Sequence, residues 1–198
     1  MGGIIIDMLN DYVIALDEGL LIFIERSIRK EIPDNYQYLL SSRISDRLAD
    51  DIERIIGLCV RGYKNRITPG RIRHIYKRHG ENGVADSSMA DIRDIAKIGY
   101  IVENYNKIEK GNDTSGEFKN KDGSPSKTVV LQGNLDDEYF YVVEAVPDSA
   151  RKTLYVTTAY INKNDTIAEA GDALSLNPDV QNGLQSDVSS NIIIPRDK

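Results

Sequence analysis

The sequence predicts an α+β fold: N-terminal helices followed by a small antiparallel β-sheet, a meander, packed on helices. In the first half of the chain, apolar residues recur every three or four positions, as they do on one face of a helix. After residue 126 they gather instead into short β-branched and aromatic runs separated by turn residues. Helices first and strands afterwards are typical of α+β domains, because alternating α/β folds interleave the two.

The first 62 residues predict a helical hairpin. Apolar side chains at helical spacing indicate a helix over residues 4–30, and the Pro-Asp-Asn turn signal follows it. A second helix is expected near residues 42–61, with a stop at Gly62. Its apolar face comprises Ile44, Leu48, Ile52, Ile55 and Cys59. We therefore expect a buried Cys59, a hairpin over residues 1–62 and a main domain over residues 63–198.

A third helix is predicted directly after Thr68. Thr68 is a suitable N-cap, Pro69 suits the first helical position, and Gly80 suits the position after the last turn. A further helix is expected to start at Ser87 or Ser88, because isoleucines follow there at helical spacing. These two helices connect the hairpin to the predicted sheet.

Three strands are predicted after a long polar loop over residues 111–126. Their β-branched and aromatic runs are Lys127–Leu131, Glu138–Val146 and Thr153–Ile161, with turn residues between them. The segment after the third strand is rich in Asn, Asp, Ser and Gly, so an irregular C-terminal segment is expected. Near its end, Ile192–Ile194 predicts a short edge strand.

Residues 61–79 are the most basic part of an acidic protein. Seven Lys or Arg and both histidines fall there without an acidic residue, although the formal net charge of the chain is −6. Residues 61–110 hold 11 basic and 6 acidic side chains, so the rest of the chain is strongly acidic. A general polyanion binder is usually basic throughout. A locally basic surface on an acidic body indicates a confined site for a phosphate-rich partner instead.

Helical geometry separates the two histidines. At about 100° per residue, His79 lies within about 20° of Ile72 on the apolar face, whereas His74 lies on the opposite face. His79 is therefore a candidate catalytic group beside the sheet, or a C-terminal histidine that interacts with the helix dipole. His74, Arg73 and Lys77 are candidate substrate-binding residues, or solvated surface residues.

Hydroxyl side chains on the third strand are further candidates. Strand alternation places Thr158 and Tyr160 on one face with Leu154 and Val156. Thr158 and Tyr160 can donate hydrogen bonds to a phosphate, although ordinary half-buried strands favour the same residue types. Lys127, at the start of the first strand, is a candidate cation for the substrate or an edge charge.

Several kinds of site find no support in the sequence. Two histidines and one cysteine, without CxxC or HExxH spacing, predict no metal site. Neither a Walker loop nor a dinucleotide fingerprint occurs, so no cofactor is expected. Acidic residues interrupt the apolar N-terminus, which lacks the features of a signal peptide or a spanning helix. A lone cysteine fits a reducing compartment, so we expect a soluble, cytoplasmic protein without a membrane partner.

Three short motifs occur in an order that resembles a known family. They are an I-x-x-I-x-x-RHG helix at residues 72–80, a DI-x-x-I helix at residues 91–95, and a meander ending in Thr158-Ala159-Tyr160. This order resembles the phage-associated barnase/EndoU/colicin/RelE-like nuclease domains over roughly residues 66–195. The resemblance implies an RNase-like α+β domain within residues 63–198, in which a helix packs on a four-stranded sheet.

The same resemblance implies metal-independent RNA cleavage. His79, Arg78, Thr158 and Tyr160 match the motif positions and are the implied catalytic residues. His79 would act as general base or acid while a ribose 2′-OH attacks the neighbouring phosphate. Arg78, with Lys127 added on charge and position, would stabilise the pentavalent phosphate. Because the 2′-OH is required, single-stranded RNA is the expected substrate.

Two other functions remain open from the sequence. The predicted sheet segment is acidic at residues 136–138, and neither histidine lies on a predicted strand. Both observations favour a non-catalytic phage structural or binding protein that keeps the nuclease-like fold, with a phage head protein or an immunity protein as partner. A transferase or toxin activity on the same small scaffold is the third reading, because fold does not fix function.

Overall fold

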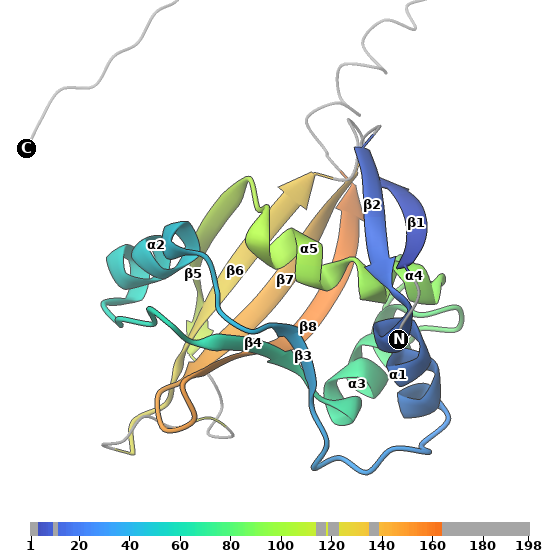
Figure 1. Cartoon of the computed structure of the whole chain (residues 1–198), viewed down its shortest axis with the longest axis horizontal. Helices are drawn as coiled ribbons and strands as arrows, with labels where there is room; N and C mark the ends of the chain where they lie inside the picture. Colours follow the sequence, from blue (N-terminus) through green and yellow to red (C-terminus); the bar gives the residue numbers. More distant parts are fainter. Residues whose placement is uncertain (1–3, 10–11, 114–117, 119–122, 135–138, 164–198) are drawn as a thin grey trace, which may run out of the picture.

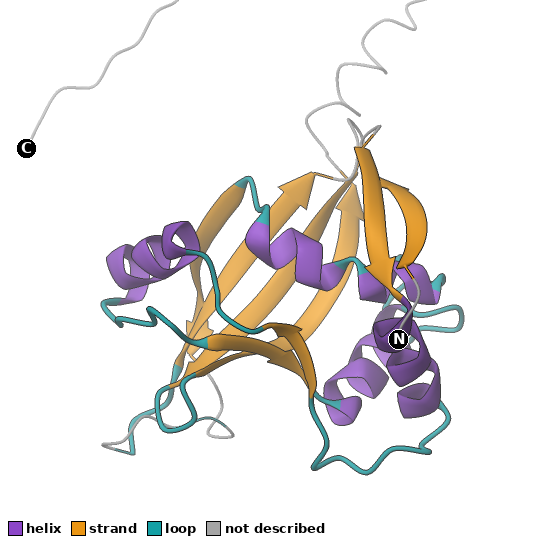
Figure 2. Cartoon of the chain, in the orientation of Figure 1, coloured by secondary structure: helices purple, strands orange, loops and turns teal. Residues whose placement is uncertain are grey.

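A computed structural model describes residues 4–9, 12–113, 118, 123–134 and 139–163 of the chain. The helices are α1 (Glu18–Ile28), α2 (Asp46–Ile56), α3 (Pro69–His79), α4 (Ile92–Ala96) and α5 (Ile98–Glu103). The strands are β1 (Ile4–Leu9), β2 (Tyr12–Asp17), β3 (Tyr38–Ser41), β4 (Lys64–Ile67), β5 (Lys107–Asp113), β6 (Lys127–Asn134), β7 (Tyr139–Asp148) and β8 (Thr153–Lys163). Figures 1 and 2 show these elements.

The main sheet has six strands in the order β3-β4-β8-β7-β6-β5. Strands β5 to β8 follow one another as an antiparallel meander: the sequence predicts its last three strands, and β5 is a fourth that reaches into the start of the predicted loop at residues 111–126. Strand β4 then joins β8 in parallel, and β3 pairs with β4 at the edge, so the complete sheet is mixed. The predicted α+β class is confirmed, with a sheet larger than the predicted meander.

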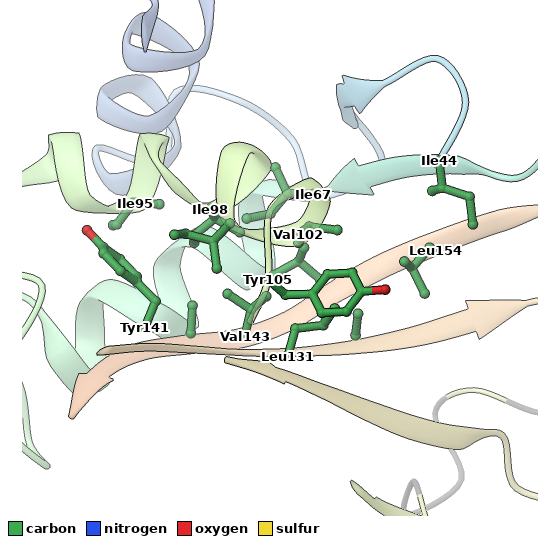
Figure 3. Close-up of a cluster of buried hydrophobic side chains, with 14 of the residues drawn as sticks. Ile44, Ile67, Ile95, Ile98, Val102, Tyr105, Leu131, Tyr141, Val143 and Leu154 are labelled. Carbon is green, nitrogen blue, oxygen red and sulfur yellow. The ribbon is translucent and has the colours of Figure 1, made fainter. Parts of the chain in front are cut away.

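One hydrophobic core fills the space between the sheet and its helices. Helix α5 crosses the sheet against β6 and β7, α2 packs on β5 and β6, and α3 lies beside β8 (Figure 1). Figure 3 shows Ile98 and Val102 of α5 above Leu131 and Val143 of the sheet. All four side chains are buried. We call the side covered by α5 the core face of the sheet, and the opposite side the second face.

The predicted helix over residues 4–30 is wrong in its first half. Strands β1 (residues 4–9) and β2 (residues 12–17) pair in antiparallel fashion, and α1 begins only at Glu18. Isoleucine and valine are abundant in the hairpin, and these β-branched residues favour strands. The Asp17 side chain then accepts a hydrogen bond from the Gly19 N–H at 2.8 Å and starts the helix.

The N-terminal residues do not form a hairpin with a core of its own. Leu16, Ile52, Val60 and Tyr63 belong to the same core as the sheet, and β3 pairs into that sheet. A boundary after residue 62 therefore falls within one hydrophobic core. The reason is that β3 and β4 are strands of only four residues, too short to leave a clear pattern in the sequence.

Cys59 is exposed rather than buried. Helix α2 carries the predicted apolar residues Leu48, Ile52 and Ile55, but its last residue is Ile56 and Gly57 is its C-cap, so the helix does not reach Cys59. Gly57 has a φ of 71°, the left-handed conformation that ends many helices. Cys59 thus lies beyond the last turn and is turned outward.

The basic helix and the three strands are confirmed. Thr68, Pro69 and Gly80 occupy their predicted cap positions on α3. The helix expected from Ser87 instead begins at Ile92 with Asp91 as its N-cap, and the predicted edge strand at residues 192–194 lies outside the described residues. None of the helices in the described part of the chain has the length and apolar character needed to cross a membrane.

A β-bulge in β8 changes which side chains face the core. Glu144 pairs with Thr158, but the next residue of β7 pairs with Val156, so Thr157 is an extra residue. Val156 lies in the core, and after the bulge Ala159 and Ile161 take over that role. Thr158 and Tyr160 therefore point to the second face. The prediction that they share a face with Leu154 and Val156 is wrong, because uninterrupted alternation does not survive a bulge.

Candidate active site

Helix α3 ends in a tight turn that only glycine permits. Its last turn carries Lys77, Arg78 and His79, and basic side chains interact favourably with the negative end of the helix dipole. At Gly80 the chain passes so close to the preceding turn that a Cβ atom would lie 2.5 Å from the Tyr76 carbonyl oxygen. The chain therefore leaves the helix sharply and folds back along it.

The segment that folds back, residues 80–90, forms a helix-capping loop. Its backbone N–H groups donate to the last carbonyls of α3: Val84 to Lys77 at 3.0 Å, Ala85 to Arg78 at 2.9 Å, and Met89 to His79 at 2.7 Å. Gly83 is required inside the loop, because a Cβ atom there would collide with the backbone oxygens of residues 78 and 86. This packing fixes the next side chains of the loop against the helix end.

The helix-capping loop presents Asp86 to His79. The Asp86 Oδ2 lies 2.8 Å from His79 Nδ1, and its Oδ1 accepts from the Ser88 N–H at 2.9 Å. Burial raises the pKa of the Asp86 carboxyl, but hydrogen bonds from Ser88 and His79 outweigh burial, so the net pKa is lowered. Asp86 is therefore ionised near neutral pH and holds a proton on Nδ1, which leaves Nε2 for chemistry.

Tyr160 stacks on the imidazole. The two ring centroids are 5.2 Å apart and the ring planes differ by 24°. Burial raises the pKa of the Tyr160 phenol, and the carboxylates of Glu144 and Asp86 raise it further. The phenol therefore keeps its proton at neutral pH and is a hydrogen-bond donor beside His79.

Glu144 is the acidic neighbour of this pair on the sheet. It pairs with Thr158 across β7 and β8, while Val142 pairs with Tyr160, so Glu144 and Tyr160 are diagonal neighbours on the second face. Partial burial raises the pKa of the Glu144 carboxyl. A half-buried carboxylate with a raised pKa is a suitable proton acceptor near neutral pH.

Sequence reasoning missed both Glu144 and Asp86. A signal for Glu144 exists, because it is the one acid within the apolar run of residues 141–146. No comparable signal exists for Asp86, since its role depends on how the loop folds. We refer to His79, Asp86, Glu144, Thr158 and Tyr160 as the His79 cluster.

The structure brings together only some of the predicted site residues. His79, Thr158 and Tyr160 lie together, with Thr158 and Tyr160 on the second face of β8. Arg78 precedes His79 and is exposed, and its carbonyl oxygen anchors the helix-capping loop. His74 is exposed earlier on α3.

Two predicted substrate-binding cations, Arg73 and Lys127, make contacts outside the His79 cluster. Arg73 donates to the Ser27 carbonyl at 3.1 Å and pairs with Asp34, so it joins α3 to the end of α1. Lys127 donates to the Ile56 carbonyl at 2.9 Å, at the C-terminus of α2 and at the opposite end of the sheet from Tyr160. Lys77 is exposed on α3.

A metal site is not evident in the part of the chain that the structure describes. There, no three His, Cys, Asp or Glu side chains gather in a way that could hold a metal ion. The His79 cluster instead combines an imidazole, two carboxylates, a phenol and a hydroxyl. Together, these side chains can accept a proton, donate a proton and orient a phosphate.

Comparison with known proteins supports a nuclease family. The family model described as phage-Barnase-EndoU-ColicinE5/D-RelE like nuclease3 matches residues 42–169, well over half of the chain. The matched range includes every member of the His79 cluster. Neither the curated proteins nor the solved structures contain a match to this chain.

Proposed function

Because this chain belongs to that phage-associated nuclease family, we propose that it cleaves single-stranded RNA without a metal ion. The observation that carries the proposal is the imidazole of His79, oriented by Asp86 through Nδ1, stacked on Tyr160 and accompanied by Glu144 on the second face. General acid–base catalysis of RNA cleavage needs one group to accept a proton and one to donate it. This cluster supplies both.

In the proposed reaction, Glu144 accepts the proton of a ribose 2′-OH. The 2′-oxygen then forms a bond to the neighbouring phosphorus, and the bond from phosphorus to the 5′-oxygen breaks. His79 donates its Nε2 proton to the departing 5′-oxygen. The products are a 2′,3′-cyclic phosphate and a free 5′-hydroxyl, so atoms and protons balance.

The remaining side chains act on the phosphate. Tyr160 keeps its proton because its pKa is raised, so it donates a hydrogen bond to a non-bridging oxygen. Thr158 supplies a second donor, and the adjacent Arg78 guanidinium offsets the charge that develops in the transition state. Asp86 does not touch the substrate in this scheme; it orients the His79 ring through Nδ1.

The test is cleavage of a labelled RNA oligonucleotide in excess EDTA, with the ends analysed for cyclic phosphate. The wild-type protein should cleave, and His79→Gln should lower the rate by about 10²- to 10⁴-fold, the usual contribution of a positioned acid or base. Arg26→Ala removes an exposed cation of α1 and is the matched control. Cleavage that requires a divalent metal, or that ignores His79→Gln, would refute the proposal.

The acidic body of the chain favours one alternative, a non-catalytic phage structural or binding protein. Only residues 61–110 carry excess positive charge within a chain of net charge −6. Under this alternative, RNA would bind with a steep salt dependence and yield no product. A phage head protein or an immunity protein would then be the partner to seek.

RNA as substrate would place the activity in the cytoplasm of the host cell.

A further inference from the structure

A cavity lies near the start of α3, away from the His79 cluster. It has a volume of about 490 Å³ and is bordered by residues from α3, β8, the loop before β3 and the β7–β8 turn. Those that matter here are Arg71, His74, Tyr155, Arg151, Gln37 and Phe118. No member of the His79 cluster lines it, so it is a separate feature.

The cavity is rich in positive charge. Arg71 and Arg151 both line it, and its carboxylate, Asp34, is ion-paired with Arg73. The backbone at the N-terminus of α3 also faces the cavity through Thr68 and Gly70, which adds the positive end of an 11-residue helix dipole. Guanidinium groups beside a helix N-terminus are suited to a phosphate.

The cavity is also aromatic. The Phe118 and Tyr155 rings lie 5.8 Å apart with a 32° angle between their planes, and the Arg71 guanidinium lies 5.6 Å from the Phe118 centroid. The Tyr155 hydroxyl accepts from Gln37 Nε2 at 3.1 Å, and Gln37 in turn accepts from Arg66 at 2.8 Å. Aromatic rings and guanidinium planes are the surfaces on which unpaired bases stack.

The cavity and the His79 cluster lie at two ends of one helix–strand pair. Tyr155 precedes the bulge of β8 and lies on the second face, as Tyr160 does after it, about 17 Å farther along the strand. On α3, Arg71, His74 and Arg78 are spaced by three and four residues, so they share one side of the helix. Cations and aromatic rings therefore continue from the cavity toward the catalytic histidine.

We propose that this cavity is a subsite for a nucleotide of the RNA chain, remote from the bond that is cleaved. Arg71 holds a phosphate of that nucleotide with the help of Arg151, which is also ion-paired with Asp148, and Phe118, packed on the buried Tyr155 ring, receives its base. This inference rests on the proposed function, because it extends the same substrate along α3 and β8. It predicts that the protein prefers longer single strands to a dinucleotide.

The first experiment compares kcat/KM on a dinucleotide with kcat/KM on an RNA octanucleotide. The variant Arg71→Ala should lose about tenfold or more on the octanucleotide, chiefly through KM, and should leave dinucleotide cleavage unchanged. The variant Arg26→Ala removes one exposed arginine of α1 and serves as the matched control for charge loss. An equal loss on both substrates, or no loss on the octanucleotide, would overturn the subsite.

A second experiment separates the subsite from the chemistry. Fluorescence anisotropy measures binding of a labelled octanucleotide to His79→Gln protein, with and without Arg71→Ala. Binding that weakens about tenfold with Arg71→Ala supports the subsite, even if the wild-type protein cleaves nothing and the proposed function fails. If AMP binds more tightly than the octanucleotide, the cavity takes a free nucleotide and the RNA subsite is wrong.

Discussion

Two clusters in this molecule contain the same kinds of side chain in different surroundings. In the His79 cluster a base, a carboxylate and a phenol are supplied by His79, Asp86 and Tyr160. In a second cluster, which we call the Lys97 cluster, Asp94 lies 3.3 Å from Lys97 Nζ and accepts from the Tyr141 hydroxyl at 3.1 Å. Both clusters join a helical segment to a neighbouring strand of the sheet.

The two clusters differ in access and in charge balance. Tyr141 is fully buried, and Figure 3 shows it on the core face close to Ile95. Burial raises the pKa of Asp94, and Lys97 and Tyr141 only partly oppose that effect. Tyr160, by contrast, is half exposed on the second face, where Glu144 adds a second carboxylate. Similar groups therefore stabilise the fold when enclosed and can meet a substrate when one side is open.

The sharpest test of this comparison removes the basic group from each cluster. His79→Gln should lower RNA cleavage by about 10²- to 10⁴-fold and change stability little, because the amide can still donate to Asp86. Lys97→Met should destabilise the fold by about 3–5 kcal/mol, because it leaves a buried carboxylate without its partner. Urea denaturation and initial cleavage rates measure the two effects. Loss of activity from Lys97→Met without loss of stability would break the distinction.

Glu144→Gln should have the next largest effect, about 10²-fold on cleavage, through loss of the proton acceptor. Its effect on stability depends on pH. The folded-state pKa of Glu144 is raised, so the stability that its proton provides is present below the unfolded pKa and is lost as pH rises through the folded pKa. Relative to wild type, the variant should therefore gain a few degrees in Tm between about pH 4 and pH 7. Thermal scans across that range check the sign, and a constant difference would refute it.

Asp86→Asn should lower kcat by about 10- to 10²-fold, because an amide no longer fixes the Nδ1 proton and the orientation of the imidazole. The folded-state pKa of Asp86 is lowered, so its contribution to stability is present above the unfolded pKa and lost as pH falls through the folded pKa. The variant should thus be less stable than wild type at pH 7 and similar to it at low pH. The pH profile of kcat distinguishes a positioning residue from a merely structural one.

Tyr160→Phe should cost about tenfold in cleavage, because it removes one hydrogen bond to the phosphate and keeps the stack on His79. The matched variant Tyr141→Phe should leave activity unchanged and cost about 1 kcal/mol of stability through its lost bond to Asp94. Parallel kinetics and denaturation of the two variants make the comparison direct. Equal activities of the two variants would contradict it.

Lys127→Ala should have the smallest effect. Its ammonium group binds a carbonyl at the end of α2, so the variant should lose about 0.3–1 kcal/mol of stability and none of the activity. A tenfold loss of cleavage would instead support the sequence-based prediction that Lys127 contacts the substrate.

The sequence predicts those parts of the fold whose signals are local. Thr68, Pro69 and Gly80 mark the ends of α3 because caps depend on a few neighbouring residues. The three long strands are predictable because each has eight or more residues and contains a run of β-branched and aromatic side chains. The hairpin at residues 4–17 is not, since its apolar residues fit a helical period as well as a strand.

The site is predictable in part for the same reason. The position of His79 on the apolar side of α3 follows from helical periodicity, and that residue is buried. The partners of His79 do not follow, because Asp86 arrives through a loop and Glu144 through pairing of distant strands. The bulge at Thr157 depends on the register between β7 and β8, which a single strand does not encode.

The hydrogen bond between Ser88 and Ile161 means that the helix-capping loop also covers part of the edge of β8, which bears on self-association. Strand β4 pairs with β8 only at residues 153–155, so among the described residues no strand pairs with the outer edge of β8 beyond them. Ser88 Oγ accepts the Ile161 N–H at 3.2 Å on that edge. An uncovered strand edge is a template for pairing between molecules. A substitution that displaces the loop would therefore move Asp86 away from His79 and also expose the unpaired backbone groups of β8. Inactive variants at Gly80 or Gly83 are thus expected to form oligomers and to precipitate on concentration.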